Sequence, residues 1–479
     1  MHSEPALLQP DLPLCVDLDG TLIRSDLLVE STLALLRQQP LQALRVPFWL
    51  LRGRAYLKQQ IARRVSLDAA SLPYDARVLA RLHEVAGQRP RILCTASDEV
   101  LAQAVAAHVG VFDEVMASNG VANLSGDEKA AHLCQRFGER GFDYAGNERR
   151  DLKVWRHARR AIVVNAAASL RSQAAEVCEV EREFPREGGG LRDWVRALRL
   201  HQWLKNLLVF LPLLAAHHFF DTGALSHAIM AFLAFGICAS GVYVLNDLLD
   251  LESDRHHPRK RLRPFAAGTL PVQAGLLAAP LLTLVAFALA FAITPRFAVV
   301  LGGYFLLTLA YSLVLKRMVM LDVVVLAALY TIRIVAGGVA TATPLSFWLL
   351  AFSMFLFLSL AMLKRYTELR GAQQLGRSAA SGRGYSVEDL PLIQSFGGAS
   401  GYLAVLVLAL YINSAASEML YRHPPVLWLL CPLLLYWISR AWAIAHRDSM
   451  HDDPLVFAAR DGVSWIVLAL SGLVVLGAI

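Results

Sequence analysis

The stretch Asn246–Pro264, NDLLDLESDRHHPRKRLRP, places three aspartates directly before a run of basic residues. Asp247, Asp250 and Asp254 are spaced three and four residues apart, so on a helix they share one face. Carboxylates crowded in this way repel one another unless cations lie between them. Mg²⁺ is the natural cation, because it is a hard ion that is often bound through carboxylates together with substrate phosphates. The stretch therefore predicts a catalytic magnesium site for a diphosphate.

The basic side chains that follow the aspartates suit phosphate oxygens. A long apolar segment ends where the stretch begins, which places the predicted site at a membrane surface and next to a lipid. A solvated loop that obeys the positive-inside rule would also explain the basic residues. It would not explain three acids on one helical face. The candidate phosphate ligands of this stretch are Asn246, Lys260, Arg261 and Arg263.

The 479 residues are 56% hydrophobic, too apolar for an ordinary soluble protein, and the apolar residues are unevenly spread. Residues 1–185 have the pattern of a soluble α/β domain, and 199–479 consist mostly of long apolar runs. Between them, Glu179–Arg192 (EVEREFPREGGGLR) predicts a flexible joint, with the linker at 186–198. The net charge of +7 fits loops near anionic lipid, so no nucleic-acid partner is needed.

Six cysteines without a C-x-x-C pair indicate scattered thiols in a reducing compartment, and no signal peptide is expected. If residues before 204 are cytoplasmic, the outer loops hold only Arg296 and Arg422, a strong positive-inside bias. A multi-pass protein of the cell membrane with a cytoplasmic N-terminal domain is therefore expected. The predicted membrane helices are 204–221, 224–246, 272–294, 297–315, 319–340, 346–363, 397–416, 425–443 and 462–479.

Polar residues recur inside these segments or at their ends. Arg333 lies well inside the fifth, where a charge is costly and usually functional, although a structural pair with a buried acid is the alternative. A single Lys or Arg at a helix end can be explained by snorkelling, but their recurrence on the side of the aspartate cluster favours an anionic substrate. The candidates for substrate and phosphate binding are Lys205, Tyr311, Lys316, Asp322, Arg333, Lys364 and Arg365.

The N-terminal domain contains a second acidic motif. Leu14–Thr21, LCVDLDGT, reads as a buried strand that ends in D-x-D-G-T. Two aspartates two residues apart at a strand end can share Mg²⁺, and one of them can attack phosphorus. This motif resembles that of the haloacid-dehalogenase-like phosphatase superfamily. The resemblance implies an α/β Rossmannoid fold, with a helical cap from Leu27 to about Arg81.

By this resemblance, Asp17 is the nucleophile and Asp19 the general acid/base. Thr95 in RILCTAS and Lys129 match the phosphate-binding residues, and the strand Ala161–Asn165 follows the acidic metal motif. One departure is that Asn147 stands where the first acid of that motif is expected, which removes one charge from the site. A degenerate domain kept for folding or regulation is therefore the alternative. The implied metal ligands are Asp17, Asp19, Asn147 and Asp151.

The membrane half resembles the UbiA-type superfamily of intramembrane prenyltransferases, because N-D-x-x-D-x-x-x-D matches its first aspartate motif. The resemblance implies a nine-helix transmembrane bundle with a central cavity, and Mg²⁺ bound through Asp247, Asp250 and Asp254. Six segments further resemble the decaprenyl-phosphate phosphoribosyltransferase branch. Its acceptor is a polyprenyl phosphate, and its donor is phosphoribosyl pyrophosphate. These segments are HQWLKNLLVFLPLLAAH (201–217), LRPFAAG (262–268), YSLVLK (311–316) followed by Asp322, IRIVAGGVAT (332–341), LKRYTEL (363–369) and DDPLVFAARD (452–461).

In the superfamily's second motif, D-x-x-x-D, Asp322 is present but Leu326 replaces the second acid, which argues against a quinone-type prenyltransferase. The fusion suggests a two-step enzyme, in which phosphoribosyl transfer is followed by removal of the 5-phosphate on the way to an arabinose donor lipid. Two alternatives stay open. One is a UbiA-type enzyme that prenylates an aromatic or small lipid acceptor, and the other is a membrane scaffold or transporter with an inactive phosphatase domain. Homo-oligomer formation is also left open.

Overall fold

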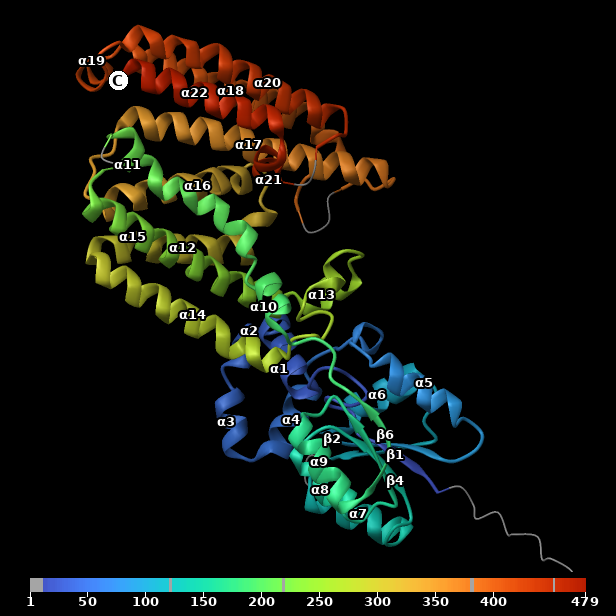
Figure 1. Ribbon diagram of the computed structural model, residues 1–479. Coiled ribbons are helices and arrows are strands. Elements are labelled where there is room, and N and C mark those ends of the chain that lie inside the picture. Colours follow the sequence, from blue (N-terminus) through green and yellow to red (C-terminus); the bar gives the residue numbers. More distant parts are fainter. Residues whose placement is uncertain (1–11, 120–122, 218–219, 380–382, 451–452) are drawn as a thin grey trace, which may run out of the picture. The chain divides into compact units, whose positions relative to one another are not determined.

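The computed structural model describes residues 12–119, 123–217, 220–379, 383–450 and 453–479, which form two compact units (Figure 1). The first comprises Met1–Leu198 and Tyr243–Pro280, and the second comprises Arg199–Val242 and Leu281–Ile479. The segment with the aspartate motif thus belongs to the same unit as the N-terminal part of the chain. The predicted domain boundaries at 185, 198 and 199 stay a prediction.

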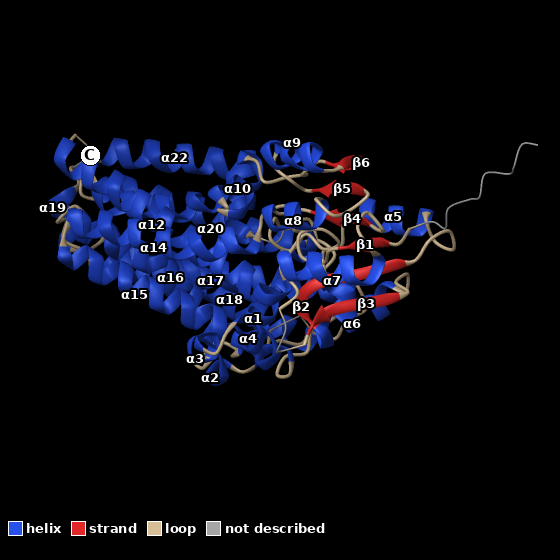
Figure 2. Cartoon of the chain, turned by 90° about the horizontal axis from the view of Figure 1, so that it is seen from below, coloured by secondary structure: helices blue, strands red, loops and turns tan. Residues whose placement is uncertain are grey.

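The first unit contains a six-stranded sheet in the order β3-β2-β1-β4-β5-β6, with every neighbouring pair parallel (Figure 2). Val16 at the end of β1 lies in register with Leu93 of β2 and Ala145 of β4. The strands after β1 are added first on one side of it (β2, β3) and then on the other (β4, β5, β6), and such a switch point opens a crevice at the carboxyl ends of the strands. The strands are β1 Leu14–Val16, β2 Arg91–Asp98, β3 Glu114–Ser118, β4 Asp143–Gly146, β5 Arg160–Val164 and β6 Glu179–Phe184.

Successive residues of each strand pack on opposite faces of the sheet, as the strand period of two requires. Leu14 and Val16 belong to a core with helices α5 (Ala76–Glu84) and α6 (Glu99–Val109). Cys15 belongs to the other core, which contains residues of α7 (Asp127–Phe137), α8 (Leu152–Trp155) and α9 (Ala168–Val177). Helices therefore cover both faces, so the crevice at the strand ends is the exposed polar edge.

The stretch predicted to be helical from Leu27 to Arg81 forms four helices, a 3₁₀ turn and α5. Asp26 caps the first helix, because its side chain accepts from Val29 N. A small apolar cluster around Trp49 and Ile61 holds the four helices together. They are α1 (Leu27–Gln38), α2 (Pro40–Ala43), α3 (Val46–Leu51) and α4 (Arg54–Ala62).

The joint predicted at Glu179–Arg192 is wrong for its first half and for the end of the linker. Glu179–Phe184 is β6, the edge strand of the sheet, and Leu191–Ala197 is helix α10. The charged composition misled the prediction, because an edge strand tolerates charged side chains on both faces. Arg81, for example, donates to Glu181 of β6 at 2.5 Å.

Seven helices of the described residues are long and apolar enough to cross a membrane. The predicted segment 204–221 instead forms an 11-residue 3₁₀ helix, Leu200–Phe210, followed by α11 (Leu211–Ala215). Pro212 lacks a backbone N–H, which weakens an α-helix across this junction. The ninth segment is α22, Gly462–Ala478, of 17 residues. The seven are α12 Thr222–Leu249, α14 Val272–Ile293, α15 Pro295–Leu313, α16 Leu321–Ala340, α17 Phe347–Gln374, the span Val387–Ile412 that contains α18 (Leu390–Ile412) and the span Pro424–His446 that contains α20 (Leu430–His446).

Helix α17 continues 11 residues beyond its predicted end at Leu363, so Lys364 and Arg365 lie inside the helix. The continuation contains good helix formers, and Arg365 is fully buried by its partners. Glycine determines a second packing detail. A Cβ on Gly337 of α16 would lie 2.0 Å from the carbonyl oxygen of Val209, so only glycine lets the 3₁₀ helix pack this closely. The shorter helices are α13 Leu251–His256, α19 Ala415–Leu420 and α21 Pro454–Arg460.

Candidate functional sites

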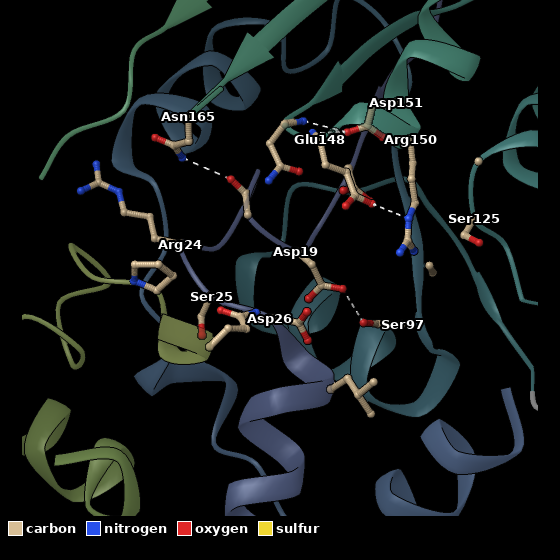
Figure 3. A pocket seen from close by; sticks show the side chains of 18 of the residues that line it. Asp19, Arg24, Ser25, Asp26, Ser97, Ser125, Glu148, Arg150, Asp151 and Asn165 are labelled. Atoms are coloured by element: carbon tan, nitrogen blue, oxygen red, sulfur yellow. Dashed lines mark hydrogen bonds and ion pairs between the residues drawn. The ribbon is translucent and has the colours of Figure 1, made fainter. Parts of the chain in front are cut away.

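A polar cavity of about 440 Å³ lies in the first unit, beside the carboxyl ends of β1, β2 and β4 (Figure 3). Asp17 and Asp19 follow β1 directly, and Asp151 follows β4 through a short 3₁₀ turn. The predicted ligands Asp17, Asp19, Asn147 and Asp151 all line this cavity, together with Lys129. Residues from separate parts of the sequence therefore converge there because parallel strands end at one edge.

Asp17 and Lys129 form a buried ion pair at the wall of the cavity. Lys129 Nζ lies 2.7 Å from Asp17 Oδ1 and donates to the Tyr144 hydroxyl at 2.9 Å. Burial raises the pKa of Asp17 to about 7, against the attraction of Lys129. Burial is the largest single influence and would lower the pKa of Lys129, but the attraction of Asp17, Cys94 and Asp151 together raises it. The lysine is therefore a fixed cation beside the carboxylate.

Asp19 is oriented by two donors. Its Oδ2 accepts from Ser97 Oγ at 2.7 Å, and its Oδ1 accepts from Leu27 N, in the first residue of α1, at 2.8 Å. Burial and then the nearby Asp26 raise the pKa of Asp19 to about 6, and the two hydrogen bonds oppose this shift. A carboxyl held in place with a pKa near neutrality can exchange a proton with a reacting group.

The hydroxyl at the end of β2 that faces the cavity is Ser97. The predicted phosphate ligand Thr95 is fully buried, is not among the residues that line the cavity, and accepts a hydrogen bond from Ser97 N at 3.0 Å. The phosphate-binding role of Thr95 stays a prediction. Ser97 belongs to the same TAS triplet and lies two residues nearer the carboxyl end of β2, where the cavity is.

Glu148 lines the cavity beside Asn147, the position where an acid is expected (Figure 3). Asn147 Oδ1 accepts from Thr21 Oγ1, and the Asn147 and Glu148 amides both donate to Asp151 Oδ2, at 2.8 and 2.9 Å. Burial raises the pKa of Glu148. Glu148 was not predicted from the sequence as a site residue. The oxygen donors gathered here suit Mg²⁺, with Asp17, Asp19 and Asp151 as its carboxylates.

Basic side chains surround the acids of the cavity. Lys58 of α4 donates to the Ala96 carbonyl at 2.5 Å and to Asn123 Oδ1 at 3.1 Å. Burial lowers the pKa of Lys58. Its position could not be read from the sequence, because α4 packs beside the cavity only in the folded chain. The other basic side chains of the lining are Arg24, Arg54, Arg150 and Arg186.

The aspartate motif spans the junction of α12 and α13. Asp247 lies in α12, Asp250 lies between the helices, and Asp254 lies in α13. The amides of Asp250 and Asp254 still bond four residues back, to Asn246 and Asp250, so the helical path continues across the junction. Asp247 and Asp254 approach the same partner, Arg263, and a face shared with Asp250 stays a prediction.

Arg263 bridges the first and last acids of this motif. Its Nη1 lies 3.1 Å from Asp247 Oδ1 and 2.5 Å from Asp254 Oδ2, and both aspartates are almost fully buried. Burial raises the pKa of Asp254, and Arg263 opposes the shift. Two carboxylates directed at one cationic group form a donor set that fits Mg²⁺. The predicted ligand Arg263 therefore lies at the aspartate cluster.

The rest of the basic run divides between surface and core. Lys260 and Arg261 lie on the exposed 3₁₀ turn Lys260–Leu262. Arg255 is buried and forms a bidentate ion pair with Glu30 of α1. Its Nη2 lies 2.6 Å from Glu30 Oε1, and its Nη1 lies 3.1 Å from Glu30 Oε2. Arg255 therefore connects α13 to the N-terminal part of the chain, a role that no local sequence pattern could show.

In the second unit, Asp322 and Arg365 form a sealed ion pair. Arg365 donates to Asp322 at 2.6 Å, to Glu368 at 2.5 Å and to the Tyr311 hydroxyl at 2.7 Å, and Tyr385 donates to the other oxygen of Asp322. Both members of the pair are at most 1% exposed. The predicted substrate ligands Tyr311, Asp322 and Arg365 therefore bond to one another.

Arg333 has a different set of partners from the acid weighed in the sequence. It donates to Asn206 Oδ1 at 2.9 Å and to the Tyr304 hydroxyl at 3.0 Å, and its guanidinium lies over the Tyr304 ring. Lys316 lies on the 3₁₀ turn Leu315–Arg317. Arg333 is therefore stabilised by neutral polar groups and an aromatic face.

Lys205 and Lys364 both face Asp453, with nitrogen–oxygen distances of 2.8 and 3.8 Å. Asp452 lies outside the described residues. Lys205 also lies at one end of an apolar pocket of about 190 Å³. Its other lining residues are Leu204, Leu207, Leu208, Leu211 and Leu214. An apolar surface next to two ammonium groups can accommodate a lipid chain that ends in a phosphate.

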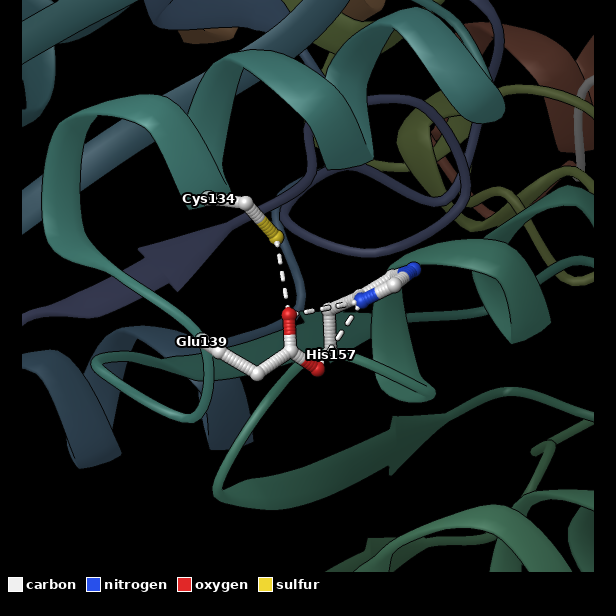
Figure 4. A group of neighbouring side chains, drawn as sticks. All are labelled: Cys134, Glu139 and His157. Carbon is white, nitrogen blue, oxygen red and sulfur yellow. Dashed lines mark hydrogen bonds and ion pairs between the residues drawn. The ribbon is translucent and has the colours of Figure 1, made fainter.

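A third group of candidate metal ligands is Cys134, Glu139 and His157 (Figure 4). Glu139 accepts from His157 Nδ1 at 2.9 Å and from the Cys134 thiol at 3.7 Å. None of the three lines the cavity of the first unit; Glu139 is exposed, and Cys134 and His157 are half-buried. The contacts are those of a surface ion pair with a neighbouring thiol.

Comparison with known proteins identifies relatives of both the whole chain and its membrane half. The uncharacterized protein y4nM of Sinorhizobium fredii is 38% identical over 463 residues, which is 96% of this chain and 89% of that protein. The decaprenyl-phosphate phosphoribosyltransferase of Mycobacterium tuberculosis is 41% identical over 186 residues, 38% of this chain and 62% of that enzyme. A solved UbiA homolog from Archaeoglobus fulgidus, bound to GPP and Mg²⁺, has a TM-score of 0.46 and 17% identity, and the match covers 59% of this chain and 99% of that one.

The UbiA prenyltransferase family model matches residues 207–470. This range contains the aspartate motif and all seven apolar helices, and it is more than half of the 479 residues. The chain is therefore a multi-pass membrane protein that belongs to the UbiA prenyltransferase family, a family of transferases.

Proposed function

We propose that the membrane half transfers 5-phosphoribose from phosphoribosyl pyrophosphate to a polyprenyl phosphate. The lipid phosphate oxygen forms a bond to the anomeric carbon of ribose, and the bond from that carbon to pyrophosphate breaks. We further propose that the N-terminal part is a phosphatase of the haloacid-dehalogenase-like type. It would hydrolyse the 5-phosphate of the lipid-linked product and release inorganic phosphate.

The observation that carries the transferase proposal is the aspartate motif, with Asp247 and Asp254 facing one cationic group. Asp247, Asp250 and Asp254 would hold Mg²⁺, which when bound neutralises charge on a diphosphate. Arg263 is placed to contact the phosphate oxygens of that donor. An aspartate site with an arginine beside it favours departure of pyrophosphate whichever carbon it leaves.

The acceptor assignment is supported by the membrane half and its relatives. Leu326 occupies the position of the second acid in the D-x-x-x-D motif. Asp322, the first acid of that motif, accepts a hydrogen bond from Arg365. The 41% identity to decaprenyl-phosphate phosphoribosyltransferase favours a lipid phosphate as acceptor. Lys205, which lines the leucine-rich pocket, and Lys364, which shares Asp453 with it, are suited to bind that phosphate.

The phosphatase proposal is supported by the cavity of the first unit. Asp17 is placed to attack phosphorus, Asp19 to exchange a proton with the leaving oxygen, and Lys129 to stabilise charge on the phosphoryl oxygens. Asp17, Asp19 and Asp151 would hold Mg²⁺, and Glu148 adds an acid where Asn147 lacks one. The cavity therefore contains each group that phosphate-monoester hydrolysis needs.

The proposal is tested with the full chain in detergent, Mg²⁺, polyprenyl phosphate and phosphoribosyl pyrophosphate labelled in the ribose. Label in the lipid fraction is expected, and Asp250→Asn should reduce its rate at least about a hundredfold. Glu252→Gln is the matched control, because it removes an acid from the same segment but outside the motif. Transfer from a prenyl diphosphate to an aromatic acceptor, without labelled lipid, would instead establish the prenyltransferase reaction that the family name describes.

A further inference from the structure

One wall of the cavity in the first unit is formed by residues that follow the N-terminal part of the chain. Gly268, Pro271 and Gln273 line it, although the other lining residues all lie before Leu191. These three belong to the segment Pro264–Gln273, which joins the aspartate motif to α14 and is called here the wall segment. The cavity is therefore complete only when this part of the membrane half packs against the sheet domain.

Two glycines allow the close approach of the wall segment. A Cβ on Gly268 would lie 2.7 Å from Arg24 Cβ and 3.2 Å from the Arg24 carbonyl oxygen, and its φ is +71°. A Cβ on Gly188 would lie 2.7 Å from Thr269 Cβ. Both contacts leave no room for a side chain, so the wall segment is fitted to its position.

Arg255 contacts the wall segment through a hydrogen bond to its backbone. Its Nε donates to the Ala266 carbonyl at 3.0 Å, while its guanidinium pairs with Glu30. Glu30 Oε1 also accepts from Ser25 Oγ at 2.5 Å, and Ser25 lines the cavity. A continuous set of buried polar contacts therefore links the wall segment to the cavity lining.

The wall segment also connects the cavity to an apolar helix. Gln273 lies in the first turn of α14, one of the helices long and apolar enough to cross a membrane. The cavity is therefore lined by the end of a candidate membrane-spanning helix. Its basic side chains, Arg24, Arg54, Lys58, Arg150 and Arg186, suit a phosphate carried by a group with further negative charge.

We propose that the wall segment selects the substrate of this cavity, favouring a phosphate monoester borne by a membrane lipid over the same group free in solution. The inference rests on the proposed phosphatase activity and adds its specificity. Gly268, the contact point with Arg24, is a positioning residue for this wall. The lipid keeps its phosphate in the surface plane, and the wall segment aligns that phosphate with Asp17.

The test uses the full chain in lipid nanodiscs and two probes, polyprenyl-phosphoryl 5-phosphoribose in the bilayer and ribose 5-phosphate in solution. The quantity measured is the ratio of kcat/KM for the two. Gly268→Ala should lower this ratio about tenfold or more, because displacing the wall misaligns the lipid-borne phosphate. Gly110→Ala is the matched control, since Gly110 also has a positive φ, +69°, but no atom within 4 Å of its added Cβ. It should leave the ratio unchanged within about twofold.

Equal effects of Gly268→Ala and Gly110→Ala on the ratio would overturn the inference, as would a wild-type protein that does not prefer the lipid-borne probe. Failure of the proposed function has a separate signature, in which wild type releases no more phosphate from either probe than Asp17→Asn does. A binding measurement with Asp17→Asn, which cannot turn over, adds a second readout. Gly268→Ala in this background should weaken retention of the labelled lipid. Undiminished retention would contradict the proposed role of the wall segment.

Discussion

Two buried ion pairs of nearly equal geometry have different surroundings. Asp17 and Lys129 meet at 2.7 Å in the first unit, and Asp322 and Arg365 meet at 2.6 Å in the second. Asp17 lines a cavity, and its neighbours Asp151 and Asp19 repel it. Asp322 instead accepts from both Arg365 and Tyr385, and Arg365 is saturated by further acceptors. A buried ion pair that borders a cavity can therefore act on a substrate, whereas one enclosed by further partners stabilises the fold.

The largest expected effect is the loss of phosphate release on replacing Asp17. Asp17→Asn removes the proposed nucleophile, so hydrolysis of lipid-linked 5-phosphoribose should fall at least about a thousandfold. Transfer of labelled ribose to lipid should continue, and phosphorylated lipid should accumulate. Asp127→Asn, at an exposed acid of α7 outside the cavity, should change neither rate. Unchanged lipid products in Asp17→Asn would refute the assignment of Asp17.

Removal of Arg365 from its buried ion pair with Asp322 should lower the stability of the fold. Arg365→Ala leaves Asp322 buried without its cation, which should cost about 3–5 kcal/mol. Urea titration in detergent, followed by the helical circular dichroism signal, measures this loss. Arg370→Ala removes a half-exposed partner of Asp448 in the same helix and should cost less than about 1 kcal/mol. If Arg365→Ala kept wild-type stability but lost activity, the pair would belong to the active site instead.

The smallest expected effect concerns Asp75, a buried acid outside the cavity that pairs with Arg24 and Arg77. Although burial opposes it, hydrogen bonding from Arg77 and the charge of Arg24 hold the pKa of Asp75 well below its usual range. Its stabilising contribution is therefore present above the unfolded pKa of about 4 and is lost as the pH falls below that value. Asp75→Asn should cost about 2 kcal/mol at pH 7 and much less near pH 2.

Hydrogen exchange of β1 and β2 peptides, corrected for the intrinsic pH dependence, measures this effect. Asp113→Asn is the control, because Asp113 pairs with Arg91 at the surface and should contribute less than about 1 kcal/mol. A cost of Asp75→Asn that stays constant from pH 7 to pH 2 would show that the carboxylate charge is not what stabilises the fold.

Patterns of apolar and polar residues within short stretches predicted much of the architecture. The short apolar run at Leu14 ends in two aspartates, and the structure has a parallel strand there with both acids at its end. Long apolar runs predicted membrane helices, and seven meet the length and composition. Such features depend on residues within one or two helical turns of one another, so the order of residues alone determines them. Charged edges such as β6 were missed because their strand pairing is not local.

Only the tertiary structure decided which charged residues face a cavity. Arg255 and Arg263 belong to one basic run, yet Arg255 pairs with Glu30, 225 residues away, and Arg263 lies between the acids of the motif. The wall segment could not be assigned to the N-terminal cavity from its sequence either. The physical reason is that desolvation and pairing depend on which distant group completes a contact. The sequence determined which chemical groups are present and on which elements, and folding determined which of them are engaged with one another and which face a cavity.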